Sequence, residues 1–313
     1  MLIYDEQKNF NNDPIETPFF STGPLAASIG AKLVGLDINT LTDASFEAFA
    51  GALYHHKMIY LRDQEITPET QEALTLRFGE FGTDAYTKGL EGHPNIQPVV
   101  KEAETKSKMV FGGGWHTDSP FLQRPPSVSL LYALEIPPYG GDTIWYNSAL
   151  AYNNLSDVMK QMLAPLKIHM SGEKVVASLQ GLMAQSKSQK KPEEKATGEK
   201  AIGDMSLEID VQAMIDGAFH PLVRTHPVTG QKALFVDKVY AKNIEGMNPY
   251  ESAPLIDFLV SHITQEVFSC RLRWAPKTLC LWDNRLCLHR AFNDYDGHRR
   301  ELHRTTVIGE TPA

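Results

Sequence analysis

The sequence predicts a mainly β fold with flanking helices, and three observations support this prediction. Short segments with strand patterning recur from residues 23–40 to the C-terminal stretch 299–309. Helical spacing of apolar residues is confined to a few stretches, of which 42–56 is the clearest. The chain contains no internal sequence repeat. Many short strands with a few helices at one end and one side are typical of a β-sandwich or a β-barrel, and the pattern alone leaves both open.

Each predicted element has a local justification. Thr42 or Asp43 can cap the first helix, and Pro68 suits the first turn of the second. Pro227 to Gly230 reads as the turn of a hairpin. The predicted elements are, in chain order, short strands with turns at 23–40, a helix at 42–56, a buried strand at 57–61, a helix at 67–78, strands at 127–136 and 137–146, a helix at 148–163, a hairpin at 220–236, a helix at 250–270, and closing strands at 277–284, 285–292 and 299–309.

Residues 183–205 differ in composition from the rest of the chain. Five lysines and three glutamates lie between 187 and 200, with hardly any apolar residue larger than alanine. A solvated loop is the simplest interpretation, and a lid or an inserted helix are the alternatives. We therefore predict one domain over residues 1–313, with a lysine-rich inserted loop or lid around 175–216.

Composition excludes several classes of function. A net charge of −8 with no obvious basic face argues against a nucleic-acid or anionic-membrane partner. The N-terminus has no basic region followed by an apolar core, and no apolar run approaches the roughly 20 residues of a membrane span. Cys270, Cys280 and Cys287 are too few for a disulfide framework and fit a reducing compartment. We expect a cytoplasmic protein.

The stretch GGGWHTDSP, residues 112–120, resembles half of a metal site. On a strand, His116 and Asp118 would project from the same face, while Trp115 and Thr117 would face the other way. An imidazole and a carboxylate together suit Fe(II), Mn(II) or Zn(II). The preceding glycines leave space beside the pair for something other than protein.

The other half is expected near the C-terminus. His289 lies in the apolar stretch 279–292, and the turn residues 293–297 fold the next strand back as a hairpin. On that return strand, Arg300 and Arg304 are four residues apart and therefore share a face. Buried guanidinium groups are costly unless an anion meets them. The pattern therefore indicates an anion-binding cavity beside a metal.

These residues resemble the TauD/TfdA family (taurine dioxygenase-like) of Fe(II)- and 2-oxoglutarate-dependent dioxygenases. The family pattern of His-x-Asp, Thr, His and Arg falls on His116, Asp118, Thr143, His289 and Arg300, with 24 residues between Asp118 and Thr143 and ten between His289 and Arg300. The flanking stretches WHTDSPF, GGDTIWY and LWDNRLCLHR also match, and the likeness extends from about residue 20 to 310.

The resemblance implies a double-stranded β-helix (jelly roll, cupin-like) and an oxidoreductase that uses Fe(II), 2-oxoglutarate and O₂. His116, Asp118 and His289 would be the metal ligands and the catalytic centre, while Thr143 and Arg300 would bind the C5 carboxylate of 2-oxoglutarate. The reaction would hydroxylate or oxidatively cleave a small anionic substrate, with release of succinate and CO₂. Asp283 and Asn284, in the turn WDN, would be supports for the ligands or ordinary turn residues.

For the substrate, the resemblance indicates Arg304, with Tyr240 as a further candidate. The sulfonate-binding His of taurine dioxygenases corresponds to Asp84, and the Asn that meets the taurine amine corresponds to Gly112. An aspartate would repel a sulfonate and a glycine offers no amine acceptor, so taurine is disfavoured. An aryloxyalkanoate, an alkyl sulfate or sulfonate, or a similar acid is expected instead.

Two other interpretations stay open at this point. A zinc hydrolase could use the same two histidines and aspartate with an activated water, although it would give Arg300 no role. A jelly-roll binding module could capture an organic acid without oxidising it. A homo-oligomer, dimer or tetramer, is the expected assembly.

Overall fold

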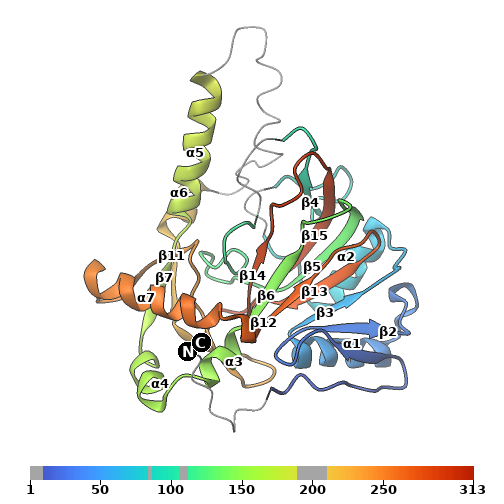
Figure 1. The fold of residues 1–313 in the computed structure, drawn as a ribbon, viewed down its shortest axis with the longest axis horizontal. Helices are drawn as coiled ribbons and strands as arrows, with labels where there is room; N and C mark the ends of the chain where they lie inside the picture. The colour runs from blue at the N-terminus through green and yellow to red at the C-terminus, as the bar shows by residue number, and fades with distance from the viewer. Residues whose placement is uncertain (1–9, 84–86, 106–111, 189–209) are drawn as a thin grey trace.

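Two β-sheets face one another in the computed structural model, and helices cover their outer sides (Figure 1). The structure describes residues 10–83, 87–105, 112–188 and 210–313. The major sheet has seven strands in the order β1-β2-β3-β13-β5-β15-β4, and the minor sheet has three in the order β12-β6-β14. Two smaller sheets, β11-β7-β8 and β10-β9, lie outside this sandwich. The predicted jelly-roll class is confirmed.

The strands are mostly antiparallel, and β2 and β3 pair in parallel. In chain order the elements are β1 (Ser21–Pro24), β2 (Ala31–Val34), η1 (Ile38–Thr40), α1 (Asp43–His56), β3 (Met58–Leu61), α2 (Pro68–Phe78), β4 (Gln97–Lys101), β5 (Pro126–Glu135), β6 (Thr143–Asn147), α3 (Ser148–Asn153), α4 (Asp157–Leu163), β7 (Lys167–Met170), α5 (Glu173–Ser188), α6 (Val211–Asp216), β8 (Ala218–Pro221), β9 (Val223–Thr225), β10 (Lys232–Leu234), β11 (Ala241–Ile244), α7 (Pro249–Ile263), η4 (Glu266–Phe268), β12 (Ser269–Leu272), β13 (Leu279–Asp283), β14 (Cys287–Ala291) and β15 (Arg300–Ile308). None of the described helices is both long and apolar enough to cross a bilayer.

Alternation along the major strands divides their side chains between two cores. On β13, Cys280 and Trp282 enter the core between the two sheets, where they meet Trp145 of β6. Leu279 and Leu281 of the same strand face outward and pack with residues of α1 and α2. Because successive strand residues point to opposite faces, a buried strand with helices outside is apolar on both sides.

The third core lies on the outer side of the minor sheet. Tyr146 of β6 and Leu288 of β14 pack there against α3, α7 and the small β11-β7-β8 sheet. Of the predicted metal ligands, His289 sits on β14 of the minor sheet, whereas His116 and Asp118 lie in the segment between β4 and β5.

The two N-terminal helices begin where the sequence predicts. The Thr42 side chain accepts from the Ser45 backbone N–H, and the Ser45 side chain accepts from the Thr42 backbone N–H. Thr42, and not Asp43, is therefore the N-cap of α1. Thr67 caps α2 in the same way, with Pro68 in its first turn.

Two predicted helices were too long. The helix expected at 148–163 is two helices, because the chain turns after Asn153 and the Ser156 side chain caps a new helix through the Met159 N–H. The helix expected at 250–270 ends at Ile263, and residues 269–272 instead form β12, which pairs with β6. In both cases tertiary pairing and capping outweigh helical spacing.

The lysine-rich segment falls partly outside the described residues. Helix α5 covers its beginning and projects from the body of the molecule (Figure 1), and α6 follows at residues 211–216. Residues 189–209 lie outside the described part of the chain. The single-domain organisation and the lid therefore stay predictions.

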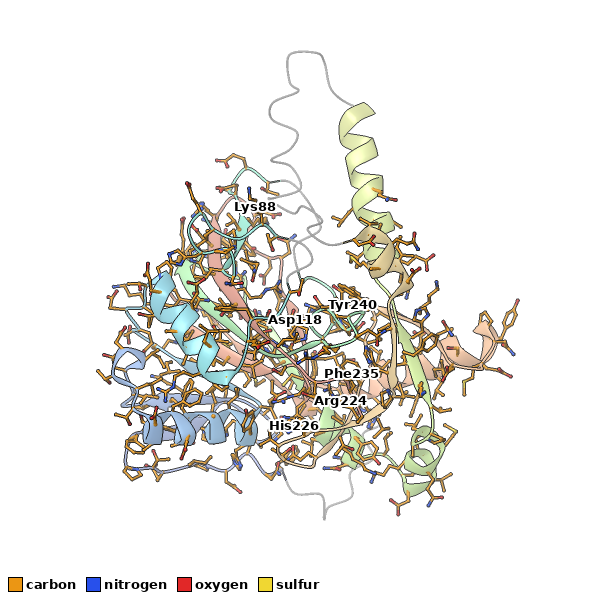
Figure 2. All side chains as sticks on the ribbon, turned by 180° about the vertical axis from the view of Figure 1, so that it is seen from behind. Lys88, Asp118, Arg224, His226, Phe235 and Tyr240 are labelled. Carbon is orange, nitrogen blue, oxygen red and sulfur yellow. The ribbon has the colours of Figure 1, made fainter. Side chains whose placement is uncertain are left out.

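A buried ion network ties the end of β13 to the C-terminal residues. The fully buried carboxylate of Asp283 accepts from Arg285 Nε at 2.8 Å and Nη2 at 2.6 Å, and from His226 Nε2 at 2.9 Å. Arg285 and Arg224 both contact Glu310. Arg224 and His226 lie below Asp118 in the view of Figure 2. The turn at 283–285, which leads into the strand of His289, is therefore held on several sides.

One histidine makes the fold sensitive to acid. His56, fully buried at the end of α1, has ring nitrogens 2.6 Å from Asn12 Oδ1 and 3.0 Å from Thr22 Oγ1. Burial, aided by the nearby His55 and Lys57, lowers the pKa of His56 from 6.5 to about 3. Between these two values the unfolded chain binds a proton that the folded chain does not, so this contribution to stability is complete above pH 6.5 and is lost as the pH falls toward 3.

We therefore expect His56→Gln to flatten the pH dependence of the unfolding free energy below pH 6.5, by up to about 1.4 kcal/mol per pH unit. Denaturant unfolding at a series of pH values measures this. The matched control is His55→Gln, at a half-buried neighbouring position. An acid slope of His56→Gln equal to that of the parent would refute the assignment.

Candidate metal centre

Two segments more than 170 residues apart in the chain are joined by a pair of backbone hydrogen bonds at the centre of the molecule. The His116 N–H donates to the His289 carbonyl at 3.0 Å, and the His289 N–H donates to the His116 carbonyl at 2.9 Å. This isolated antiparallel bridge extends the pairing of β14 beyond the minor sheet. It sets the two imidazoles side by side, with ring centroids 4.1 Å apart and ring planes tilted by 45°.

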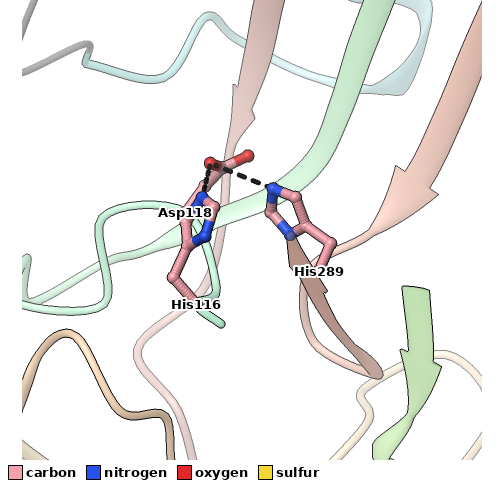
Figure 3. Close-up of side chains that lie close together, drawn as sticks. All are labelled: His116, Asp118 and His289. Atoms are coloured by element: carbon pink, nitrogen blue, oxygen red, sulfur yellow. Dashed lines mark ion pairs between the residues drawn. The ribbon is translucent and has the colours of Figure 1, made fainter. Parts of the chain in front are cut away.

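Asp118 completes the cluster (Figure 3). Its Oδ1 lies 3.7 Å from His116 Nε2 and 3.8 Å from His289 Nε2. One ligand atom from each residue lies within 4.8 Å of the other two, and all three side chains are buried. The structure thus brings together the three residues that the sequence singled out. Within the described part of the chain, no other group of three such residues has this arrangement.

The predicted strand around His116 is absent, although His116 and Asp118 still point to the same side. His116 forms only the single bridge, and Asp118 lies in a bend. Thr117 still points the other way, since its hydroxyl is 2.9 Å from the Asn284 carbonyl and 3.0 Å from that of Cys287. The bend is needed because residues 118–120 turn away toward β5, where Ser129 contacts the carboxylate.

The protonation states of the cluster suit a divalent cation. The Nδ1–H of His116 donates to the Gly114 carbonyl at 2.8 Å, which leaves Nε2 with a lone pair toward Asp118. Burial, aided by His116, lowers the pKa of His289 to about 3, so this imidazole is neutral near pH 7. Burial alone would raise the pKa of Asp118, but Arg304 and the two imidazoles outweigh it and the pKa falls to about 2. Two imidazoles and one carboxylate form the donor set of a non-haem iron site.

A second, cationic site begins at Arg300, at the start of β15. The guanidinium is buried, it forms no ion pair within the described residues, and its Nε has no hydrogen-bond partner there. Burial lowers the pKa of Arg300, while Tyr295 and Asp142 favour its charged form. A buried cation of this kind is suited to an anionic ligand.

Thr143 and Arg300 lie at the same indole ring, that of Trp274. The indole Nε1–H of Trp274 donates to Thr143 Oγ1 at 3.0 Å, so the hydroxyl hydrogen of Thr143 is available to a ligand. The Arg300 guanidinium lies 5.9 Å from the centroid of the same indole ring. At Gly141, where φ is +67°, a Cβ would lie 3.2 Å from Arg300 Cδ, so the guanidinium stem packs against bare backbone. Sequence reasoning missed Trp274 and Gly141, although the doublet Gly140-Gly141, separated from Thr143 by one residue in the stretch GGDT, is a visible signal.

The second arginine reaches the metal cluster itself. Arg304 Nη1 donates to Asp118 Oδ1 at 3.2 Å, and the side chain is buried. As predicted, Arg300 and Arg304 share the inner face of β15, while Thr305 points outward to meet Thr75 on α2 at 2.7 Å. The strand therefore places Arg304 at the metal cluster and Arg300 four residues away, on the same face of β15.

The other predicted substrate residues have mixed outcomes. Gly112 lies next to the cluster, since a Cβ there would come within 3.2 Å of His116 Cε1, and its φ is +75°. Tyr240 is buried in the outer core, 5.3 Å from the ring of Phe121, and its backbone N–H donates to Asp237. Asp84 lies outside the described residues. The structure does not test the roles of these three residues.

Comparisons with known proteins agree with this geometry. The sequence profile described as "Taurine catabolism dioxygenase TauD, TfdA family" matches residues 21–306. An alpha-ketoglutarate-dependent sulfate ester dioxygenase of Pseudomonas putida is 30% identical over 299 residues, covering 92% of this chain and 89% of that protein. An alkylsulfatase of Acinetobacter baylyi is 29% identical over 295 residues, covering 91% of this chain and 84% of that protein.

Solved structures show the same fold. A taurine dioxygenase from Burkholderia xenovorans superposes with a TM-score of 0.73 at 30% identity, covering 95% of this chain and 93% of that chain. The structure of AAD-2 in complex with Mn(II) and N-oxalylglycine gives a TM-score of 0.71 at 27% identity, covering 94% of this chain and 98% of that chain.

The metal cluster makes a direct prediction for binding. Each of His116→Ala, Asp118→Ala and His289→Ala removes one of three ligands, so we expect Co(II) affinity, measured by anaerobic calorimetry, to fall by at least about tenfold. The control is His298→Gln, at a histidine that contacts the Tyr139 hydroxyl. Parent-like Co(II) binding by any of the three alanine variants would remove that residue from the metal site.

Proposed function

This chain belongs to the TauD, TfdA family of dioxygenases, and on that premise we propose that His116, Asp118 and His289 hold its Fe(II), while Arg300 and Thr143 hold 2-oxoglutarate. The protein is a 2-oxoglutarate-dependent dioxygenase that uses Fe(II) and O₂ and acts on a small anionic substrate. The relatives match this interpretation and not the zinc hydrolase or the binding module.

The observation that carries the residue assignment is the buried Arg300, which has no carboxylate partner among the described residues, on the strand whose Arg304 reaches a buried cluster of two histidines and one aspartate. A dicarboxylic co-substrate has one end for the metal and one end for a cation. Arg300 offers its fork to the distal carboxylate, and Thr143 adds one hydrogen bond because Trp274 already occupies its acceptor side. Neither a hydrolytic site nor a simple binding pocket requires both groups.

The bound iron and 2-oxoglutarate supply the oxidising chemistry, in which O₂ is consumed, succinate and CO₂ are released, and a substrate C–H bond is oxidised. The chain contributes position and exclusion of water. His116 is fixed by the Gly114 carbonyl, His289 packs against Trp282 with centroids 4.8 Å apart, and Asp118 is held by Ser129. All three ligand residues are at most 6% exposed, so bulk water has little access to the bound substrate.

For the substrate we propose a small organic sulfate ester, bound through its sulfate group by Arg304. Two relatives that cover nine tenths of this chain are named for sulfate esters or alkyl sulfates. Hydroxylation of the carbon that bears the ester oxygen would give an intermediate that loses sulfate as its C–O bond breaks, its hydroxyl proton leaves and an aldehyde forms. Other relatives are named for sulfonates and for phenoxypropionate, which also carry one anionic group.

Gly112 argues against a substrate that carries an amine. The residue has no side chain to accept from an ammonium group, and its positive φ with a 3.2 Å approach to His116 makes a replacement strained. Asp84 and Tyr240 are proposed as further substrate contacts. A cytoplasmic homo-oligomer without nucleic-acid or membrane partners completes the proposal, with three free buried cysteines in keeping with a reducing compartment.

A substrate panel tests the proposed class. With Fe(II), 2-oxoglutarate and O₂, we expect a medium-chain alkyl sulfate to give equal amounts of succinate and inorganic sulfate, and taurine to give no product. A phenoxyalkanoate is the third member of the panel. Efficient turnover of taurine or of the phenoxyalkanoate, with the alkyl sulfate inert, would reject the sulfate ester.

The two arginines are expected to have separable roles. Arg300→Lys removes the planar fork, so we expect the Kd of 2-oxoglutarate to rise by about tenfold or more while substrate binding changes little. Arg304→Ala should raise the KM of the substrate while anaerobic binding of 2-oxoglutarate to the Fe(II) enzyme, followed by its visible charge-transfer band, is kept. The reverse result would exchange the two assignments.

A further inference from the structure

Ser129 is the one hydroxyl that a described strand of the sandwich directs at the metal cluster. It lies on β5 between β13 and β15, where its register partners are Trp282 and Thr306. The residue is fully buried, two positions before Leu131, whose side chain belongs to the apolar core between the sheets. A hydroxyl in such a place destabilises the fold unless it is hydrogen-bonded. Its Oγ lies 2.5 Å from Asp118 Oδ2.

The direction of this hydrogen bond follows from a chain of neighbours. The indole of Trp282 can only donate, and its Nε1 lies 2.9 Å from Asn284 Oδ1. This fixes the amide of Asn284, whose Nδ2 then donates to Ser129 Oγ at 2.7 Å. Since the serine oxygen already accepts from Asn284, its single hydrogen points at Asp118.

The two carboxylate oxygens of Asp118 therefore have different surroundings. Oδ2 accepts the serine hydrogen, on the side away from the histidines. Oδ1 faces the Nε2 atoms of His116 and His289 and accepts from Arg304. Only Oδ1 is directed to the point where the two imidazoles converge.

We propose that Ser129, oriented by Asn284 and Trp282, is a positioning residue that restricts Asp118 to one metal-binding oxygen. This inference rests on the proposed metal site. A carboxylate that bound the metal through both oxygens would occupy a further coordination position, and a facial triad must leave open positions for 2-oxoglutarate and O₂. Hydrogen bonds to the ligating carboxylate also set its orientation and basicity.

The chain offers a matched control on the same strand. Ser127, two residues earlier and also buried, donates to the carbonyls of Val307 and Ile308 at 3.3 and 3.4 Å and does not touch the cluster. Ser127→Ala and Ser129→Ala thus remove the same group from the same strand at similar burial. Only the second variant frees Asp118 Oδ2.

The experiment uses the full chain, freed of metal and titrated anaerobically with Co(II), whose visible absorption reports coordination number and geometry. We expect Ser129→Ala to bind Co(II) roughly 10- to 100-fold more weakly, with a changed absorption band. Ser129→Thr, which keeps the hydroxyl and suits a strand, is expected to restore both affinity and band. Ser127→Ala should match the parent.

Thermal unfolding of the metal-free proteins separates positioning from a loss of structure. Asn284→Ala, which leaves the serine in place but removes its orientation, is expected to shift the Co(II) band in the same direction as Ser129→Ala. Parent-like Co(II) affinity and absorption in Ser129→Ala would overturn the inference, and so would an equal effect of Ser127→Ala. If Asp118→Ala also bound Co(II) like the parent, the proposed metal site itself would fail.

Discussion

The buried carboxylate of Asp118 is the constraint on which the rest of the site depends. A carboxylate that is 4% exposed inside a β-sandwich is tolerated only where cations and hydrogen-bond donors replace water. The Ser129 hydroxyl on β5 and the Arg304 guanidinium on β15 supply these groups, while His116 in the loop before β5 and His289 on β14 face the same carboxylate. Because these segments belong to both sheets, the cluster forms only when the sandwich is assembled, so folding and construction of the site are one process.

The two arginines of β15 lie in different surroundings on the same face of one strand. Arg304 lies against the metal cluster, and Arg300 lies against Trp274 and Tyr295, where it has no carboxylate partner among the described residues. The loop that carries Tyr295 is fastened by Lys101, whose Nζ contacts Asn293 and Asp296 at 2.6 and 3.0 Å. The loop beside Arg300 therefore has a support that does not involve His116, Asp118 or His289.

Much of the site could be predicted because it depends on spacing. In extended backbone, residues two or four apart point to the same side. This places His116 with Asp118, and Arg300 with Arg304, whatever the exact bounds of the strands. The structure also brings His289 to the first pair as expected. Local capping signals also located the start of α1. The stretch 148–163 divides at Ser156 through a local N-cap whose signal was passed over, whereas residues 269–272 join the minor sheet through tertiary pairing that the sequence could not reveal. Ser129 was missed for a similar reason: a serine in an apolar strand is ordinary until the neighbouring strand shows what it faces.

The arrangement also explains how relatives with one fold can be named for sulfate esters, sulfonates and phenoxypropionate. In the strand ladder, Arg300 lies opposite Lys101, and Arg304 lies opposite Gln97 on one side and Leu131 on the other. The register of the sheet therefore fixes the position of both arginines. A slip of one residue would turn both side chains out of the sandwich, so the pairing register sets the direction of both. Gly112, by contrast, lies in a loop beside His116 and outside any sheet. Loop positions tolerate exchange more readily than positions in a ladder, so the specificity of such an enzyme can change at its loops while the strands keep the cofactor geometry.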